Sequence, residues 1–243
     1  MYEFDTFAFL DVQKTGSTFI ISVLKKFCTE KTIRKEKHAG FESDFDPDKF
    51  YFISVRNPID QYLSLYSYGC SSKGKLFLRM QKNDLSHFYD KTWNGFSAWL
   101  DFMLDSENAP LLKGVYGGGN LGGIARLVGL QSYRVLALAV PDTQTAFAGA
   151  ATSSDVWTTF QSKNIANYTV KNETLRADLS ELLRTRLKNS MSDLDAALDF
   201  IASADSRNMS ERVDRSEDFP PLDARQLRMV EEREWLLYRA FGY

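Results

Sequence analysis

Residues 7–24 read FAFLDVQKTGSTFIISVL. An apolar run of strand length stops at Gln13, and a short loop follows with one lysine, one glycine and three hydroxyl side chains. A helical pattern begins directly behind the loop. Because the start of a helix has unpaired N–H groups and partial positive charge, such a turn suits a phosphate, and Lys14 adds a full charge. The stretch predicts a strand, an anion-binding turn and a helix.

The turn differs from the common loop that binds nucleoside triphosphates. That loop needs a glycine, four residues and then Gly-Lys-Ser/Thr. Here no glycine lies five residues before Gly16 or directly before Lys14. An ordinary ATP or GTP site is therefore disfavoured. Taken alone, this short motif is also compatible with a plain strand-to-helix turn that carries a solvent-exposed lysine.

Composition limits the class of protein. A chain of 243 residues with 44% hydrophobic content can bury one good core, so we expect a single domain over residues 1–243. The net charge of −2 argues against a nucleic-acid binder. Cys28 and Cys70 match no metal spacing and no redox pair. No apolar stretch approaches the ~20 residues of a membrane span, and no room for a signal peptide precedes the first strand, so we expect a cytoplasmic protein.

Hydrophobic periodicity predicts alternating strands and helices. Such alternation indicates an α/β protein, a P-loop-like three-layer fold with a central, mainly parallel sheet flanked by helices. We expect an elaborated loop at residues 69–92 and a glycine-rich turn at 114–123. The expected strands cover residues 7–12, 31–37, 50–55 and 133–140, and the expected helices cover 17–29, 58–66, 95–105, 173–188, 191–204 and 223–241.

A second anion-binding corner is expected after the strand at 50–55. Arg56 follows that strand, Asn57 is suited to cap a helix, and Pro58 suits the first helical position. Lys14 and Arg56 both follow the carboxyl end of a strand, so a parallel sheet would bring them to one edge. Ser64 lies about two helical turns further on and can face the same crevice. The alternatives are a salt bridge of Arg56 at the helix start and a solvent-exposed Ser64 hydroxyl.

Together, residues 13–18 (QKTGST) and 55–66 (VRNPIDQYLSLY) resemble the sulfotransferase family, and most closely its carbohydrate-sulfotransferase-like branch of bacterial type. The resemblance is sharp over residues 7–66. Elsewhere the resemblance is limited to a general pattern. The C-terminal residues 231–243 resemble the tail of bacterial members, and the Asn-x-Ser element at 208–210 is similar to theirs. Residues 69–130 depart freely from the family, so the acceptor is not indicated.

The resemblance implies a co-substrate and roles for individual residues. Members use 3′-phosphoadenosine 5′-phosphosulfate (PAPS) as sulfuryl donor, and no metal is expected. Arg56 and Ser64 would hold the 3′-phosphate. The loop would hold the 5′-phosphosulfate, and its residues are Gln13, Lys14, Thr15, Gly16, Ser17 and Thr18.

Sulfuryl transfer requires positioning, charge neutralisation and a base. Lys14 can neutralise the leaving phosphate oxygen. For the base we select His38, which follows the expected strand at 31–37, because the unperturbed pKa of a histidine side chain is close to neutral pH. Glu36 and Glu42 are the alternates, and an ordinary surface histidine is the structural alternative. His87, in the irregular middle region, is less favoured as the base.

The sequence therefore predicts a PAPS-dependent sulfotransferase that acts on a hydroxyl or amine of a glycan, a lipid headgroup or a small alcohol. One alternative is an atypical P-loop phosphotransferase. Such an enzyme needs acidic Mg²⁺ ligands beside the loop, and Asp11 alone gives weak support for them. The other is a nucleotide-binding domain without catalysis. We expect no nucleic-acid partner, and we expect no integral membrane segment in the chain.

Overall fold

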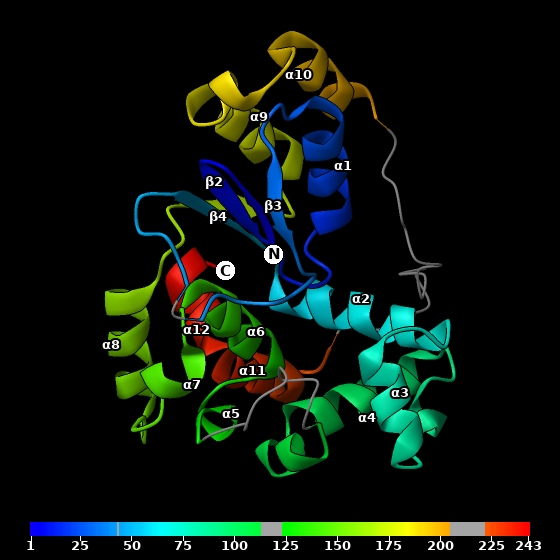
Figure 1. Cartoon of the computed structure of the whole chain (residues 1–243). Helices are drawn as coiled ribbons and strands as arrows, with labels where there is room; N and C mark the ends of the chain where they lie inside the picture. Colours follow the sequence, from blue (N-terminus) through cyan, green and yellow to red (C-terminus); the bar gives the residue numbers. More distant parts are fainter. Residues whose placement is uncertain (43, 113–122, 205–221) are drawn as a thin grey trace. The chain divides into compact units, whose positions relative to one another are not determined.

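The computed structural model describes residues 1–42, 44–112, 123–204 and 222–243. These residues form two compact units (Figure 1). The first comprises Met1–Arg56, Leu138–Pro141 and the chain from Asn164 through the helix that ends at Ser203. The second comprises the described residues within 57–137, 142–163 and 222–243.

The first unit contains a five-stranded sheet in the order β3-β1-β2-β4-β5. β2 pairs with β4, and β4 with β5, in parallel register. β1 is antiparallel to both β2 and β3, so four strands point one way and β1 opposes them. The expected α/β fold with a mainly parallel sheet is confirmed. The strands are β1 (Tyr2–Phe4), β2 (Phe7–Leu10), β3 (Thr32–Lys35), β4 (Phe50–Val55) and β5 (Tyr168–Lys171).

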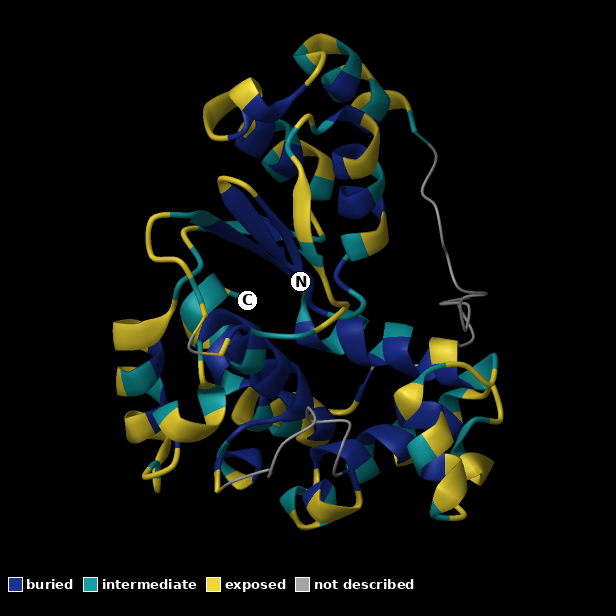
Figure 2. Ribbon diagram, viewed as in Figure 1, coloured by how far each residue is buried: buried dark blue, intermediate teal, exposed yellow. Residues whose placement is uncertain are grey.

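The apolar core of the first unit lies where α1 and α9 pack against the sheet. Phe9 and Phe52 stack in neighbouring strands with ring centroids 4.8 Å apart, and both are fully buried. Edge strand β3 is largely exposed, whereas β2 is buried throughout (Figure 2). The helices of this unit are α1 (Ser17–Phe27), α9 (Leu175–Thr185), the 3-10 helix η3 (Lys188–Ser190) and α10 (Leu194–Ser203).

The second unit is helical and has an aromatic centre. Tyr62, Tyr66, Phe96 and Trp99 are buried together, and the Tyr66 ring lies 5.4 Å from Phe96 and 5.6 Å from Trp99. The α-helices are α2 (Pro58–Cys70), α3 (Lys75–Lys82), α4 (Trp93–Leu104), α5 (Ile124–Leu127), α6 (Leu130–Ala139), α7 (Thr143–Ala146), α8 (Ser153–Lys163), α11 (Ala224–Arg233) and α12 (Trp235–Phe241), and the 3-10 helices are η1 (Ser86–Phe88) and η2 (Ser106–Leu112).

The predicted strand at residues 133–140 was wrong, because this segment belongs to helix α6. A short apolar run does not distinguish a buried strand from a buried helix. The contact that favours the helix comes from about a hundred residues away. The buried carboxylate of Glu234 accepts hydrogen bonds from the N–H groups of Gln131 (3.1 Å) and Ser132 (2.7 Å), at the start of α6.

Three further segments differ from expectation. Residues 69–92 include the amphipathic helix α3, and the single helix expected at 223–241 is two helices that meet at Glu234. Strands β1 and β5 were not predicted, since each has only three or four residues. The glycine-rich stretch at 114–123, apart from Gly123, lies outside the described residues, and so does the Asn-x-Ser element at 208–210.

Candidate anion-binding and active site

The loop between β2 and α1 is held in an unusual backbone conformation. Lys14 has φ 65° and Gly16 has φ 88°, so two residues of the loop lie in the left-handed region. That region is strained for lysine and free of strain for glycine. Such strain persists only where surrounding contacts enforce it, and it is concentrated at functional sites.

Contacts of Thr15 enforce this conformation. Its side chain is fully buried, and its hydroxyl donates to the carbonyl of Val12 at 2.7 Å. The same hydroxyl lies 2.6 Å from the hydroxyl of Ser54, which is buried within β4. The Thr15 side chain thus ties the loop to the neighbouring strand and turns inward, so only its backbone N–H is placed to serve an anion.

A glycine is required at position 16 for a second reason, close packing. A Cβ atom there would lie 2.7 Å from Nδ2 of Asn172 and 3.0 Å from Cδ2 of Leu175. Asn172 directly follows β5, and its N–H donates to the carbonyl of Val55 at 2.8 Å. The loop is therefore packed against the ends of both β4 and β5.

Helix α1 begins without a cap or an acidic first-turn residue from the described part of the chain. Its N-cap residue is Gly16, which has no side chain, and no side chain among the described residues caps the helix. The first turn carries no acidic residue. Ser17 is half-buried and Thr18 is exposed, so this end of the helix is open. Unpaired N–H groups and the helix dipole make such an end a binding site for an anion.

The structure brings Lys14 and Arg56 together. An Nη1 hydrogen of Arg56 points to the backbone carbonyl of Lys14 at 3.4 Å, and both side chains are half-buried. Burial lowers the pKa of the Lys14 amine, and the nearby positive charge of Arg56 lowers it further. Two cations held side by side repel each other, so a polyanion bound between them would stabilise both.

The predicted cap of the next helix is confirmed. The Asn57 side chain accepts from the N–H groups of Ile59 (3.0 Å) and Asp60 (3.4 Å), and Pro58 is the first residue of α2. Ser64 is half-buried on α2, in the second compact unit. Its role toward a ligand stays a prediction.

His38 contacts a buried carboxylate at the end of β2. The backbone N–H of His38 donates to Asp11 Oδ1 at 3.0 Å. The ring Nδ1 of His38 lies 2.7 Å from the Asp11 carbonyl oxygen and 3.4 Å from Asp11 Oδ2. Since a carbonyl oxygen only accepts, Nδ1 must carry the hydrogen, and the neutral ring then has its lone pair on Nε2. Asp11 is 1% exposed and also contacts the Met1 ammonium at 2.6 Å.

The other candidate bases are placed differently. The Glu36 carboxylate lies 3.3 Å from the guanidinium of Arg34, and Glu42 is exposed. His87 is exposed in η1, in the second unit, with its Nδ1 3.2 Å from the Asp84 carbonyl oxygen. Of these residues, His38 alone has its ring oriented by a residue next to the Lys14 loop.

The sequence analysis missed Ser54, Asn172 and the role of Asp11 beside His38. Ser54 supports the loop, Asn172 packs on Gly16, and Asp11 orients His38. Each had a weak signal: Ser54 is a hydroxyl inside an apolar strand, and the other two are polar residues just after a strand. Among the described residues, no group of three acidic, His or Cys side chains is arranged to hold a metal ion.

Comparison with known proteins finds a family match over the part of the chain that holds these residues. The model of the sulfotransferase family matches residues 1–113, which include the Lys14 loop, Arg56 and His38. No curated protein and no solved structure matches the chain. Within the described residues, no helix has the length and apolar character needed to cross a bilayer. The match to the sulfotransferase family thus covers slightly less than half of the 243-residue chain.

Proposed function

We propose that the protein transfers a sulfuryl group from PAPS to a hydroxyl or amine of an acceptor. The observation that supports this proposal is the pairing of Lys14 with Arg56 at the uncapped start of α1. A donor with phosphate groups at both ends of its ribose would satisfy two cations at once.

The donor would be held by the loop and the neighbouring strand end. The 5′-phosphosulfate would accept from Lys14 and from the N–H groups of residues 16–18, with Gln13 beside it in the loop. The 3′-phosphate would accept from the planar fork of Arg56, which can donate two parallel hydrogen bonds, and from Ser64. In this scheme the Thr15 hydroxyl positions the loop and does not touch the donor.

The chemical step would need one base and one neutralising cation. Nε2 of His38 would take the proton from the acceptor hydroxyl as its oxygen forms a bond to sulfur. The bond from sulfur to the bridging phosphate oxygen would break, and adenosine 3′,5′-bisphosphate would leave. Lys14 would neutralise the charge that grows on this oxygen, and the Asp11 carboxylate would stabilise the imidazolium.

The two compact units would serve one sulfotransferase domain. The acceptor would be a glycan, a lipid headgroup or a small alcohol, bound with the help of residues from about 69–130. No feature of the described part of this region selects among these acceptors.

The test compares nucleotides that differ by one phosphate. Adenosine 3′,5′-bisphosphate should raise the melting temperature far more than AMP or ATP does, and Arg56→Ala should remove most of this preference. A charged bidentate contact contributes about 1.5–3 kcal/mol, or roughly tenfold to a hundredfold in affinity. Transfer of radiolabelled sulfate from PAPS to an acceptor panel then tests the reaction. Equal melting shifts with all three nucleotides would overturn the proposal.

A further inference from the structure

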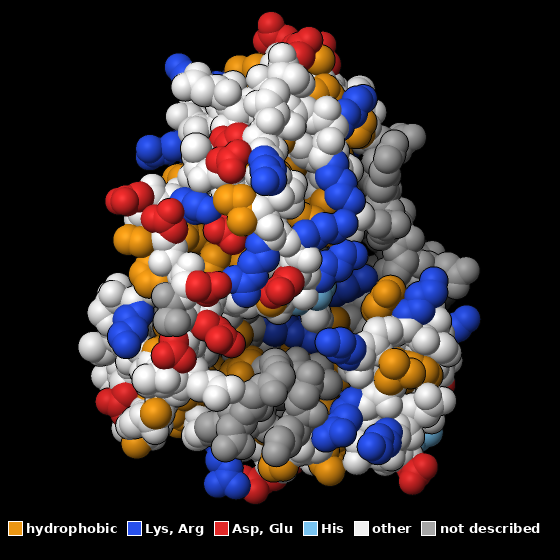
Figure 3. Space-filling view, in the orientation of Figure 1, with side chains coloured by type: hydrophobic (Ala, Val, Ile, Leu, Met, Phe, Trp, Pro, Cys, Tyr) orange, Lys and Arg blue, Asp and Glu red, His pale blue; other side chains and the backbone are white. Residues whose placement is uncertain are grey.

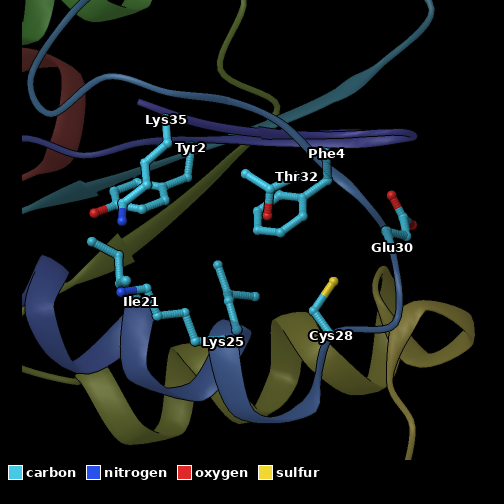
Figure 4. A pocket seen from close by; sticks show the side chains of 9 residues that line it. Tyr2, Phe4, Ile21, Lys25, Cys28, Glu30, Thr32 and Lys35 are labelled. Carbon is cyan, nitrogen blue, oxygen red and sulfur yellow. The ribbon is translucent and has the colours of Figure 1, made fainter.

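The first unit contains a hollow that the proposed reaction does not use. It lies between α1 and the β1–β3 edge of the sheet (Figure 4) and has a volume of about 260 Å³. Its floor is apolar, with Phe4, Ile21 and Leu24 all less than a tenth exposed. The other residues that line it are Tyr2, Lys25, Cys28, Glu30, Thr32 and Lys35.

The hollow has one cationic end. Figure 4 shows the amines of Lys25 and Lys35 and the hydroxyl of Tyr2 at the same end, with Cys28 and Glu30 at the other. Glu30 is already occupied, since its carboxylate accepts from the N–H of Thr6 at 2.8 Å and from the Thr6 hydroxyl at 2.6 Å. Neither lysine makes an ion pair within the described part of the chain.

Tyr2 is the most informative residue of the hollow. Its ring is buried, with the residue only 3% exposed, and its hydroxyl points to the same end of the hollow as the two lysine amines (Figure 4). Burial raises the pKa of Tyr2, and the Asp11 carboxylate adds to the rise, so this hydroxyl stays protonated and can donate. A bound anion at this end of the hollow could accept a hydrogen bond from it.

The surroundings of the hollow are basic as well. Lys and Arg side chains gather on the face of the first unit over α1 and β3 (Figure 3). Lys25 comes from α1 and Lys35 from β3, so the two cations approach the hollow from opposite walls. An anionic group between them would meet both charges and the Tyr2 hydroxyl, while an apolar body would lie along the floor.

We propose that this hollow binds a small amphipathic anion: a carboxylate, sulfate or phosphate group carried on a short apolar body. The anionic group lies between Lys25, Lys35 and Tyr2, and the apolar body extends toward Phe4 and Cys28. A water molecule takes up about 30 Å³ of liquid, so the volume accommodates roughly nine atoms of that size. A chain of about eight carbons therefore fits.

Octanoate is the probe. Octan-1-ol, which lacks the anionic group, and acetate, which lacks the apolar chain, are the controls. Calorimetry should show that octanoate binds at least tenfold more tightly than either control. Lys35→Gln and Lys25→Gln should each weaken octanoate binding about tenfold, and Tyr2→Phe several-fold. Lys31→Gln removes the same charge just outside the hollow and should leave the affinity unchanged.

Two further measurements locate the site and separate it from the proposed transferase centre. In a Cys70→Ser background, octanoate should slow alkylation of Cys28, and acetate should not. Lys14→Ala should bind octanoate normally, whether or not the protein proves to be a sulfotransferase. Equal binding of octanoate and octan-1-ol, or equal losses in Lys31→Gln and Lys35→Gln, would overturn the proposal, as would unprotected Cys28.

Discussion

Helices α1 and α6 begin in opposite ways. At the start of α6 the chain supplies its own anion: the fully buried carboxylate of Glu234 accepts from two N–H groups, from the Ser132 hydroxyl at 2.7 Å and from the Tyr62 hydroxyl. At the start of α1 no described side chain caps the helix and the first turn has no acidic residue, while Lys14 and Arg56 lie beside it. The first end is closed by the fold, and the second is where we propose that the donor binds.

A glycine permits close contact at both helix starts. At Gly129, just before α6, a Cβ atom would lie 2.2 Å from Glu234 Oε1, and at Gly16 it would lie 2.7 Å from Asn172 Nδ2. The two residues that contact these glycines have different effects on the helix start. Glu234 satisfies the helix start, whereas Asn172 packs against the glycine and leaves the positive end of α1 exposed. The residue packed against the glycine is thus charged (Glu234) where the fold caps the helix, and neutral (Asn172) where we propose that an anion binds.

The largest effect is expected at the closed end. Glu234→Ala should lower the free energy of unfolding by about 3–5 kcal/mol, because it leaves several buried donors without an acceptor. Equilibrium unfolding in urea measures the loss. Glu232→Ala, at an exposed position two residues away, is the matched control and should change stability by less than about 0.5 kcal/mol. Similar small losses in both variants would show that the cap is dispensable.

At the open end, the corresponding change should affect turnover and leave folding intact. Lys14→Ala should reduce turnover about 10²- to 10³-fold, with a smaller loss of bisphosphate affinity, since its charge matters most as the leaving oxygen becomes anionic. The melting temperature should stay at or above that of the wild type, because a half-buried cation beside Arg56 has been removed. Loss of nucleotide affinity with unchanged turnover would make Lys14 a binding residue only.

The open end supports chemistry only if a base is positioned beside it. His38→Ala should reduce turnover by roughly 10²-fold or more and leave bisphosphate binding intact. Asp11→Asn keeps an acceptor for the His38 N–H and removes the charge, so its loss of turnover should be smaller. His87→Ala, in the other unit, should have wild-type turnover. Near-normal turnover of His38→Ala with the true acceptor would assign the role of base to a glutamate.

How well the sequence predicted each region follows from the range of the interactions that form it. The start of α1 is local: strand, loop, Lys14 and helix lie within residues 7–24, so the pattern was sufficient. The cap of α2 is local too, and Asn57 and Pro58 identified it. By contrast, α6 is completed by Glu234, about a hundred residues away, and was taken for a strand. Asp11 meets His38 only through the β1–β3 pairing, so spacing alone could not reveal that contact.

The smallest expected effect concerns pH, and it has opposite signs for stability and for binding. The pKa of Lys14 is lowered from its ordinary 10.5 by burial and by Arg56. Between the lowered value and 10.5, the unfolded chain binds more protons at this residue than the folded chain does. Stability of the free protein therefore gains a contribution that rises with pH in this window.

Affinity for adenosine 3′,5′-bisphosphate should fall over the same window, by about tenfold, because the anion needs the charged amine. Lys14→Arg should abolish this fall, since a guanidinium stays protonated there. Other groups also titrate at alkaline pH, so the stability slope is taken as the difference between wild type and Lys14→Ala, measured by urea unfolding below about pH 10. Bisphosphate affinity that stays level up to that pH would show that the Lys14 charge does not contribute to binding at the open end of α1.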